Sequence, residues 1–417
     1  MRRGGSEYYA LDVTDRNAPL LLWKIGPNEA GLKRMQAAGL GFSTPAVARV
    51  NVSGATQNTL QQVLVFGGGY DTVQDNGPYA TDTNGNQIFM VDAVSGNRLW
   101  YAGPSTDTGA DLRHASMTHS IPGDVRVFDL TGDGYADRMY AADMGGRVWR
   151  FDIQNGQPRA TLVTGGVFAS LGNAHLSTRP NATTRRFYSA PDVSFLSSGG
   201  RTWLNLALGS GYRGHPLNLD TQDRFYSLRD HRPFARLTQA QYDSWTVITE
   251  ADVNLIDVTT DIAPTIPAGA SGWRMDLRRP AAGWTGEKSL SEARTVQSMI
   301  QFSTYEPNSA SSVQSSSCTP AAGTNRLYTV SAYTGAPVLN RQNPIAPPGS
   351  TDDRDTELAQ GGIAPEVVWL FPSPDNPATC VGAACRPPPQ CLVGLENCGV
   401  GINLAPVRTF WRQTGVN

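Results

Sequence analysis

The sequence predicts an all-β protein folded as a β-propeller, a ring of four-stranded antiparallel sheets called blades. Glycine and proline supply 43 and 28 of the 417 residues, an excess that indicates many tight turns. The apolar runs are short enough to be strands, and a strand–turn–strand unit recurs along the chain. We therefore expect residues 1–417 to form one propeller domain of seven irregular blades with loop and short-helix insertions, although the repeats alone do not fix the blade count.

Two recurring units supply the strands of each expected blade. The first is a short strand, a polar residue that is usually aspartate, a turn and a second strand, found at Tyr8–Trp23, Ile88–Trp100, Val148–Gln157, Arg224–Asp230 and Arg326–Leu339. The second is a Ser/Ala-x-Pro entry into a strand, followed by a strand that ends in glycines, and it begins at Ser43, Ser189 and Ile363. Together the two units give the four strands that one antiparallel blade requires.

The repeat spacing is uneven, so insertions must lie between strands. The longest insertion is Pro233–Pro280, in which Thr249 followed by Asp252 predicts the start of a short helix. The sequence also opens in the middle of a repeat. We expect Arg408–Gln413 to supply a strand that completes this first blade.

Composition and charge exclude several classes of protein. The formal net charge is −2, without the basic excess of a nucleic-acid-binding protein. No run reaches the roughly 18 consecutive apolar residues that a transmembrane helix needs. The first residues also lack the apolar region of a signal peptide, so any export must be argued from other features.

Four of the five cysteines lie in a Cys/Pro-rich loop at 373–400. Clustered cysteines form disulfides in an oxidising compartment or bind zinc in a reducing one. Their spacing of four, five and six intervening residues, without a second knuckle or a nearby histidine, favours disulfides. The sequence does not fix the pairing among Cys318, Cys380, Cys385, Cys391 and Cys398, and an odd number leaves one thiol over.

One segment has the spacing of a calcium-binding loop. Asp129, Thr131, Asp133, the carbonyl of Tyr135 and Asp137 occupy positions 1, 3, 5, 7 and 9, with a glycine at the sixth position, where the chain must turn sharply. Calcium prefers hard oxygen ligands, and three carboxylates held together would repel one another without a cation. The twelfth position lacks the glutamate of a helical calcium loop, and the flanks alternate like strands, so we expect a short calcium loop in a β-hairpin. The alternative is an ordinary Asp/Gly-rich turn.

This segment, DLTGDGYADRMYAADMGGRVWRFD, and the motifs GFSTPAV, VLVFGGGYDT, QIFMVDAVSGNRLW and LALGSGYRG resemble the C-terminal β-propeller of the PilY family of type IV pilus biogenesis factors. The resemblance runs from about Tyr8 to Trp411. It implies Ca²⁺ at Asp129, Asp133, Asp137 and the carbonyl of Tyr135. Thr131 stands where family members commonly have Asn or Asp, which puts the affinity for calcium in doubt.

The resemblance also implies a function and a location. It implies an exported protein at the outer membrane, at the pilus tip or outside the cell, whose calcium state biases pilus extension against retraction. Pilus assembly, twitching motility and surface adhesion would follow, with minor pilins, the pilus tip and host or abiotic surfaces as partners. Family members carry a long N-terminal region that would precede this sequence, and the Arg-Gly-Asp tripeptide of some members is not present here.

The alternative function is that of a pyrroloquinoline-quinone dehydrogenase, because those enzymes are also calcium-containing propellers with similar repeats. Those enzymes share a vicinal pair of cysteines, and this sequence has no adjacent cysteines. The histidines form no zinc-binding pattern, and we expect His114 and His119 to lie in a solvated polar loop. The tryptophans recur at strand ends, which favours packing between blades. We therefore expect a protein that is not an enzyme.

Overall fold

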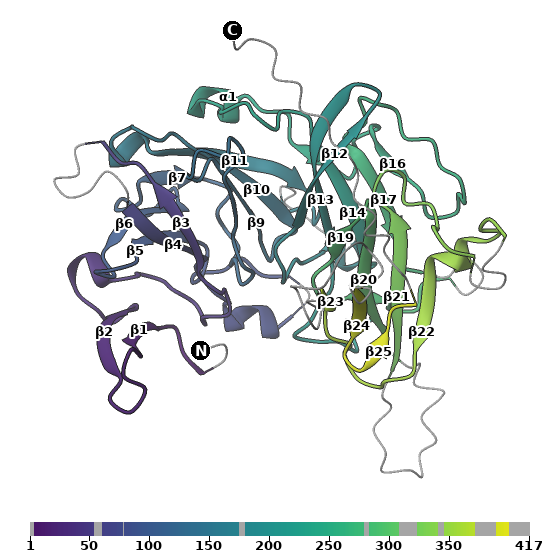
Figure 1. Cartoon of the computed structure of the whole chain (residues 1–417), viewed down its shortest axis with the longest axis horizontal. Helices are drawn as coiled ribbons and strands as arrows, with labels where there is room; N and C mark the ends of the chain where they lie inside the picture. The colour runs from purple at the N-terminus through teal and green to yellow at the C-terminus, as the bar shows by residue number, and fades with distance from the viewer. Residues whose placement is uncertain are drawn as a thin grey trace, which may run out of the picture.

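The computed structural model describes residues 4–53, 61–77, 79–174, 180–278, 283–307, 323–340, 346–371 and 389–399. Within these ranges the chain is nearly all strand and turn, and its one α-helix is α1 (Gln239–Asp243). The prediction of an all-β chain is confirmed for this part of the protein. In Figure 1 the sheets follow one another in chain order, from purple to yellow.

A hairpin and five sheets make up the described chain. The hairpin is β1 (Tyr8–Asp12) and β2 (Leu20–Ile25). The first sheet is β3 (Ala46–Val50), β4 (Gln61–Gly67), β5 (Ile88–Asp92), β6 (Arg98–Pro104) and β7 (Leu112–His114). The second sheet is β8 (Arg126–Phe128), β9 (Arg138–Ala142), β10 (Arg147–Ile153), β11 (Val163–Ser170) and β15 (Ile248–Thr249).

The other three sheets differ in size and pairing, since β18 and β19 both pair with β20 in the fourth sheet and the fifth sheet has three strands. The third sheet is β12 (Asp192–Ser198), β13 (Arg201–Gly209), β14 (Arg224–Asp230), β17 (Gly272–Asp276) and β16 (Leu255–Asp257). The fourth sheet is β18 (Lys288–Ser289), β19 (Arg294–Val296), β20 (Met299–Glu306), β21 (Thr324–Ser331) and β22 (Asp355–Leu358). The fifth sheet is β23 (Val367–Leu370), β24 (Gln390–Val393) and β25 (Glu396–Asn397).

The expectation of purely four-stranded antiparallel sheets is wrong for the first three sheets. Each has four antiparallel strands and then a fifth strand, which runs parallel to its neighbour: β7 beside β6, β15 beside β11 and β16 beside β17. These added strands are two or three residues long, too short to carry an alternating pattern. They cover sheet edges whose backbone groups would otherwise be unpaired.

One insertion, residues 231–271 between β14 and β17, joins two of the sheets. It supplies β15 to the second sheet and β16 to the third sheet, and it also carries α1. The prediction that Thr249 starts a helix is wrong, because Thr249 is the last residue of β15. The helix begins earlier, after Thr238, whose side chain forms a capping box with Gln241.

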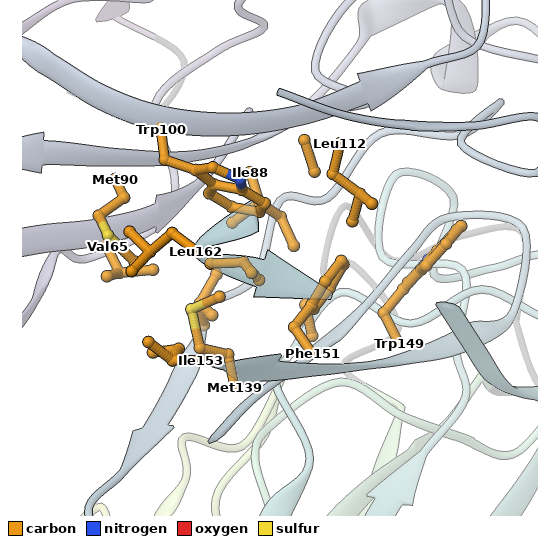
Figure 2. Close-up of a cluster of buried hydrophobic side chains, with 14 of the residues drawn as sticks. Val65, Ile88, Met90, Trp100, Leu112, Met139, Trp149, Phe151, Ile153 and Leu162 are labelled. Carbon is orange, nitrogen blue, oxygen red and sulfur yellow. The ribbon is translucent and has the colours of Figure 1, made fainter. Parts of the chain in front are cut away.

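Neighbouring sheets pack face to face through apolar side chains. Figure 2 shows the core between the first and second sheets, where Trp100 and Met90 of one sheet face Met139 and Phe151 of the other. Similar clusters join the hairpin to the first sheet, the second sheet to the third, the third to the fourth, and the fourth to the fifth. The tryptophans singled out in the sequence are buried in these clusters, as predicted for packing residues, and they are Trp23, Trp100, Trp149 and Trp203.

The described part of the cysteine-rich tail contains a disulfide between Cys391 and Cys398, with 5.3 Å between their Cα atoms. Cys391 lies in β24 and Cys398 follows β25, so this end of the predicted 373–400 loop is a hairpin instead of a loop. The other three cysteines and the expected closing strand at 408–413 lie outside the described residues. No helix in the described ranges is long and apolar enough to span a membrane.

Candidate functional site

The predicted calcium loop connects β8 to β9 in the second sheet, so the segment is a β-hairpin, as expected. Gly132 and Gly134 have φ angles of +75° and +88°, a backbone region that other residues rarely adopt. An added Cβ would meet nothing within 4 Å at either glycine. Backbone conformation, and not lack of space, is therefore the reason for both glycines.

Asp129 closes the tip of this loop through backbone hydrogen bonds. Its Oδ1 accepts the N–H of Gly132 and its Oδ2 accepts the N–H of Gly134, both at 2.7 Å. Desolvation opposes the charged form of Asp129, but the N–H groups of Gly134 and Gly132 favour it, so the pKa of this exposed carboxylate is lowered. Asp133 accepts the N–H of Tyr135 at 2.9 Å in the same way.

Asp137 closes the base of the loop and is the buried member of the set. Its Oδ2 accepts the backbone N–H groups of Leu130 and Thr131 at 2.8 and 3.0 Å and the hydroxyl of Thr131 at 3.1 Å. Its Oδ1 forms an ion pair with Arg236, a residue of the 231–271 insertion. No local pattern predicts this contact, because the two residues are 99 positions apart.

The five predicted ligands fit calcium in donor type and in order, since all are hard oxygen donors. The Thr131 hydroxyl lies 3.5 Å from Asp129 Oδ1 and 3.1 Å from Asp137 Oδ2. In the described ranges, no group of three or more histidine, cysteine, aspartate or glutamate residues is arranged to hold a metal ion. The repulsion expected among the aspartates is relieved from within the chain, by N–H groups at Asp129 and by Arg236 at Asp137. Binding of a metal by all five therefore requires Asp137 to change partner.

The residue after Asp137 fixes the insertion against the loop. Arg138 is buried, its Nε donates to Asp152 Oδ1 at 2.7 Å, and its Nη atoms donate to the carbonyls of Pro233 and Ala235 at 2.9 and 2.6 Å. Arg150, also buried, donates to Asp230 at 2.9 Å and to the same Ala235 carbonyl at 2.7 Å. Both arginines lie inside strands, and a charged residue inside a strand is the sequence signal that could have predicted such buried pairs.

A second candidate site is a cavity of about 620 Å³, lined by residues in or next to strands of all five sheets. All three predicted Ser/Ala-x-Pro entries line it, through Thr44, Ser189 and Pro365. The repeated motif thus brings the starts of the first, third and fifth sheets to one place.

Charged side chains cross this cavity as a chain of ion pairs. Glu292 contacts Arg126 at 2.5 Å and Arg294 at 2.9 Å, and Arg294 contacts Glu366 at 2.7 Å. Burial raises the pKa of Glu292, and the two arginines oppose that rise. These contacts join the second, fourth and fifth sheets, so the cavity wall has a structural role.

His119 does not lie in solvent as expected, because its side chain is buried. Burial, followed by the charge of Arg147, lowers its pKa to about 3. Its Nδ1 lies 3.0 Å from the Thr118 hydroxyl and 3.2 Å from Arg147 Nη1. His119 is therefore neutral at ordinary pH and lies in the protein interior.

No family model matches the chain. The type IV pilus biogenesis factor PilY1 homolog of Xylella fastidiosa is 24% identical over 294 residues, which cover 69% of this chain and 20% of that protein. The type IV pilus biogenesis factor PilY1 of Pseudomonas aeruginosa is 29% identical over 162 residues, which cover 38% of this chain and 11% of that protein. The chain thus spans a fifth or less of the length of these relatives.

The crystal structure of the C-terminal domain of Pseudomonas aeruginosa PilY1 matches this chain with a TM-score of 0.62. The match covers 97% of this chain and 79% of that one, at 19% identity, and it shows a common fold. The resemblance read from the sequence motifs agrees with both findings. The chain is thus similar in sequence to PilY1 proteins, the type IV pilus biogenesis factors, and shares the fold of the PilY1 C-terminal domain.

Proposed function

We propose that this chain is the calcium-binding propeller of a type IV pilus biogenesis protein and that it acts through protein contacts. The pilus role is supported by the PilY1 relatives, which are named as biogenesis factors and not as enzymes. The propeller is supported by sheets that pack face to face in chain order and meet at one cavity. The family's roles in extension and retraction, twitching and adhesion belong to this proposal, as do export and pilus-tip partners.

The observation that carries the calcium proposal is the shape of the 129–137 loop. Its glycines turn the chain as a calcium loop requires, and its oxygen donors come in the expected order. Asp129, Thr131, Asp133, the Tyr135 carbonyl and Asp137 would hold the ion. When bound, Ca²⁺ would offset two of the three carboxylate charges and hold the loop closed.

Backbone contacts connect this loop to its surroundings. The N–H of Ala136 donates to the carbonyl of Arg49 in β3 at 2.8 Å, which links the loop to the first sheet. The N–H of Asp137 donates to the carbonyl of Phe128 at 2.7 Å, at the end of β8. A change in loop order would therefore reach two sheets, and a pilus component that contacts this face would sense it.

Thermal unfolding with and without calcium tests the proposal. We expect calcium to raise the melting temperature of the wild-type chain. It should not change the melting temperature of the Asp133→Ala/Asp137→Ala variant. Asp15→Ala is a matched control, because Asp15 also accepts a backbone N–H, from Asn17 at 2.9 Å, in an exposed turn. Calcium stabilisation that persists in the double variant would contradict the assignment of the loop.

The enzyme alternative has a separate test. A pyrroloquinoline-quinone dehydrogenase would carry a quinone chromophore. We expect the absorption spectrum of the purified protein to lack a quinone band, and a stoichiometric quinone band would contradict the non-enzymatic proposal.

A further inference from the structure

We infer that Arg236 is an internal counter-cation of Asp137 that competes with the metal ion, so that calcium binding releases the Arg236 side chain from the loop. This inference rests on the proposed calcium function of the loop. It concerns a residue outside the loop and assigns that residue a regulatory role. Arg236 would set how much calcium is needed to close the loop.

The contacts of Asp137 make the two cations mutually exclusive. Three donors from Leu130 and Thr131 already occupy Oδ2, so Oδ1 is the oxygen left for a metal ion. Arg236 occupies Oδ1 in the structure. A calcium ion at Oδ1 would stand next to a guanidinium group of the same sign, and the two would repel each other.

Arg236 can leave without disturbing its neighbours. Its side chain is 33% exposed, whereas that of Asp137 is 4% exposed, so the arginine is the partner with access to solvent. The backbone on both sides is fixed independently, because Arg138 and Arg150 bind the Ala235 carbonyl and Asp152 accepts the N–H of Leu237 at 2.8 Å. The insertion therefore stays in place while one side chain moves.

The exchange alters the surface beside the loop. Without metal, the Arg236 charge is paired with a buried carboxylate. With metal, the guanidinium would lie in solvent next to a loop in which the ion offsets two of the three negative charges. The calcium-bound face would therefore be more positive than the metal-free face at this place.

Calorimetric calcium titrations of the wild-type chain, Arg236→Gln and Arg236→Lys test the inference. We expect Arg236→Gln to bind calcium about fivefold more tightly than the wild type, the factor that a partly exposed ion pair commonly contributes. Arg236→Lys keeps the positive charge and should stay nearer to the wild type. Arg232→Gln is the matched control from the same insertion, since its side chain stacks over Trp245, with 5.1 Å between the guanidinium carbon and the ring centre.

A metal-free measurement gives an independent readout. In hydrogen-exchange mass spectrometry without calcium, Arg236→Gln should exchange faster than the wild type in the peptide that covers 129–137. With saturating calcium, the two proteins should exchange alike there. Equal exchange of the two metal-free proteins would overturn the inference.

The outcomes separate this inference from the calcium proposal. If the wild type binds calcium and Arg236→Gln binds it equally or more weakly, Arg236 does not compete with the metal ion. The calcium site would then still stand. No binding by either protein would overturn both. Binding by Arg236→Gln alone would support the competition and show that the wild-type ion pair excludes the metal.

Discussion

The indole Nε1 of Trp273 in the third sheet donates a hydrogen bond to the backbone carbonyl of Ala332, just past β21 of the fourth sheet, at 3.2 Å. Trp23 makes the same contact from the hairpin to Ala93, just past β5 of the first sheet, at 3.1 Å. Both carbonyls lie in the turn of the strand–turn–strand repeat. In both turns, a glycine a few residues later packs against the indole ring. The repeat is therefore also the place where one sheet is fastened to the next.

Gly335 supports this fastening and should not tolerate a side chain. Its φ is +71°, and an added Cβ would lie 2.9 Å from Val258 and 3.1 Å from the Trp273 ring. We expect Gly335→Ala to lower the free energy of unfolding by about 2 kcal/mol, from backbone strain and displaced packing together. Gly156→Ala is the control, because Gly156 also has a positive φ, +85°, and nothing lies within 4 Å of its Cβ position. Urea unfolding would measure both variants. If Gly335→Ala lowers the free energy of unfolding no more than Gly156→Ala does, packing around Gly335 is not the cause.

Asp230 should be essential for stability, because it is one of two buried carboxylates, with Asp152, that pair with two buried arginines. It accepts from Arg150 Nη1 at 2.9 Å, from Arg138 Nη1 at 3.3 Å and from the hydroxyl of Tyr140 at 2.5 Å. We expect Asp230→Asn to cost about 3–5 kcal/mol, since it leaves buried positive charge uncompensated. The comparison is Asp257→Asn, which removes a pair with Arg274 in which the aspartate is 44% exposed and should cost under about 1 kcal/mol. Similar losses of unfolding free energy for the two variants would argue against this role of Asp230.

Glu287 should make the protein less stable as the pH rises toward neutrality. Burial, with a further contribution from the charge of Asp355, raises its pKa to about 7. The folded state therefore keeps this proton at pH values where the unfolded chain, with an ordinary glutamate pKa of about 4.3, has lost it. The folded state binds more protons between those two pKa values, so stability decreases with increasing pH across that window.

Glu287→Gln should remove this part of the pH dependence. We expect the variant to gain on the order of 2 kcal/mol relative to the wild type between about pH 4.5 and 8, measured by urea unfolding. Other buried carboxyls with raised pKa values, Asp82 and Asp223, are present in both proteins and cancel in the difference. If the wild type and Glu287→Gln differ in unfolding free energy by the same amount at about pH 4.5 and about pH 8, the prediction is wrong.

The Cys391–Cys398 disulfide closes a short loop around β25 and should stabilise the fifth sheet. Non-reducing digestion and mass spectrometry should recover a peptide pair in which these two cysteines are linked. Cys391→Ser/Cys398→Ser should cost about 2 kcal/mol, the usual effect of a disulfide that closes a small loop. A peptide that links Cys391 to any other cysteine would contradict the pairing.

The parts of the fold that the sequence predicted are those encoded by local repeats. The paired strands, the turn glycines and the buried tryptophans recur within each copy of the repeat, so one copy supports the next even though the copies are unevenly spaced. The parallel strands β7, β15 and β16 could not be predicted, because two or three residues carry no periodicity. The helix was expected at Thr249 because the capping pattern there is generic, while tertiary contacts draw that residue into the second sheet.

The same limit applies to the candidate site. The hairpin and the sharp turn at Gly134 followed from nine consecutive residues, whereas the positive φ of Gly132 was not predicted. The ion pair between Asp137 and Arg236 depends on how an insertion folds back across two sheets, and no local pattern encodes it. His119 was expected in solvent because its neighbours in sequence are polar, whereas its burial comes from segments that are distant along the chain.

Calcium content measured after equilibrium dialysis tests the central claim most directly. The account predicts one tightly held calcium ion per wild-type chain and its loss from the Asp133→Ala/Asp137→Ala variant, with the Asp15→Ala control retaining it. A wild-type chain that holds no calcium above the level of the double variant would contradict the claim that this loop is a calcium site.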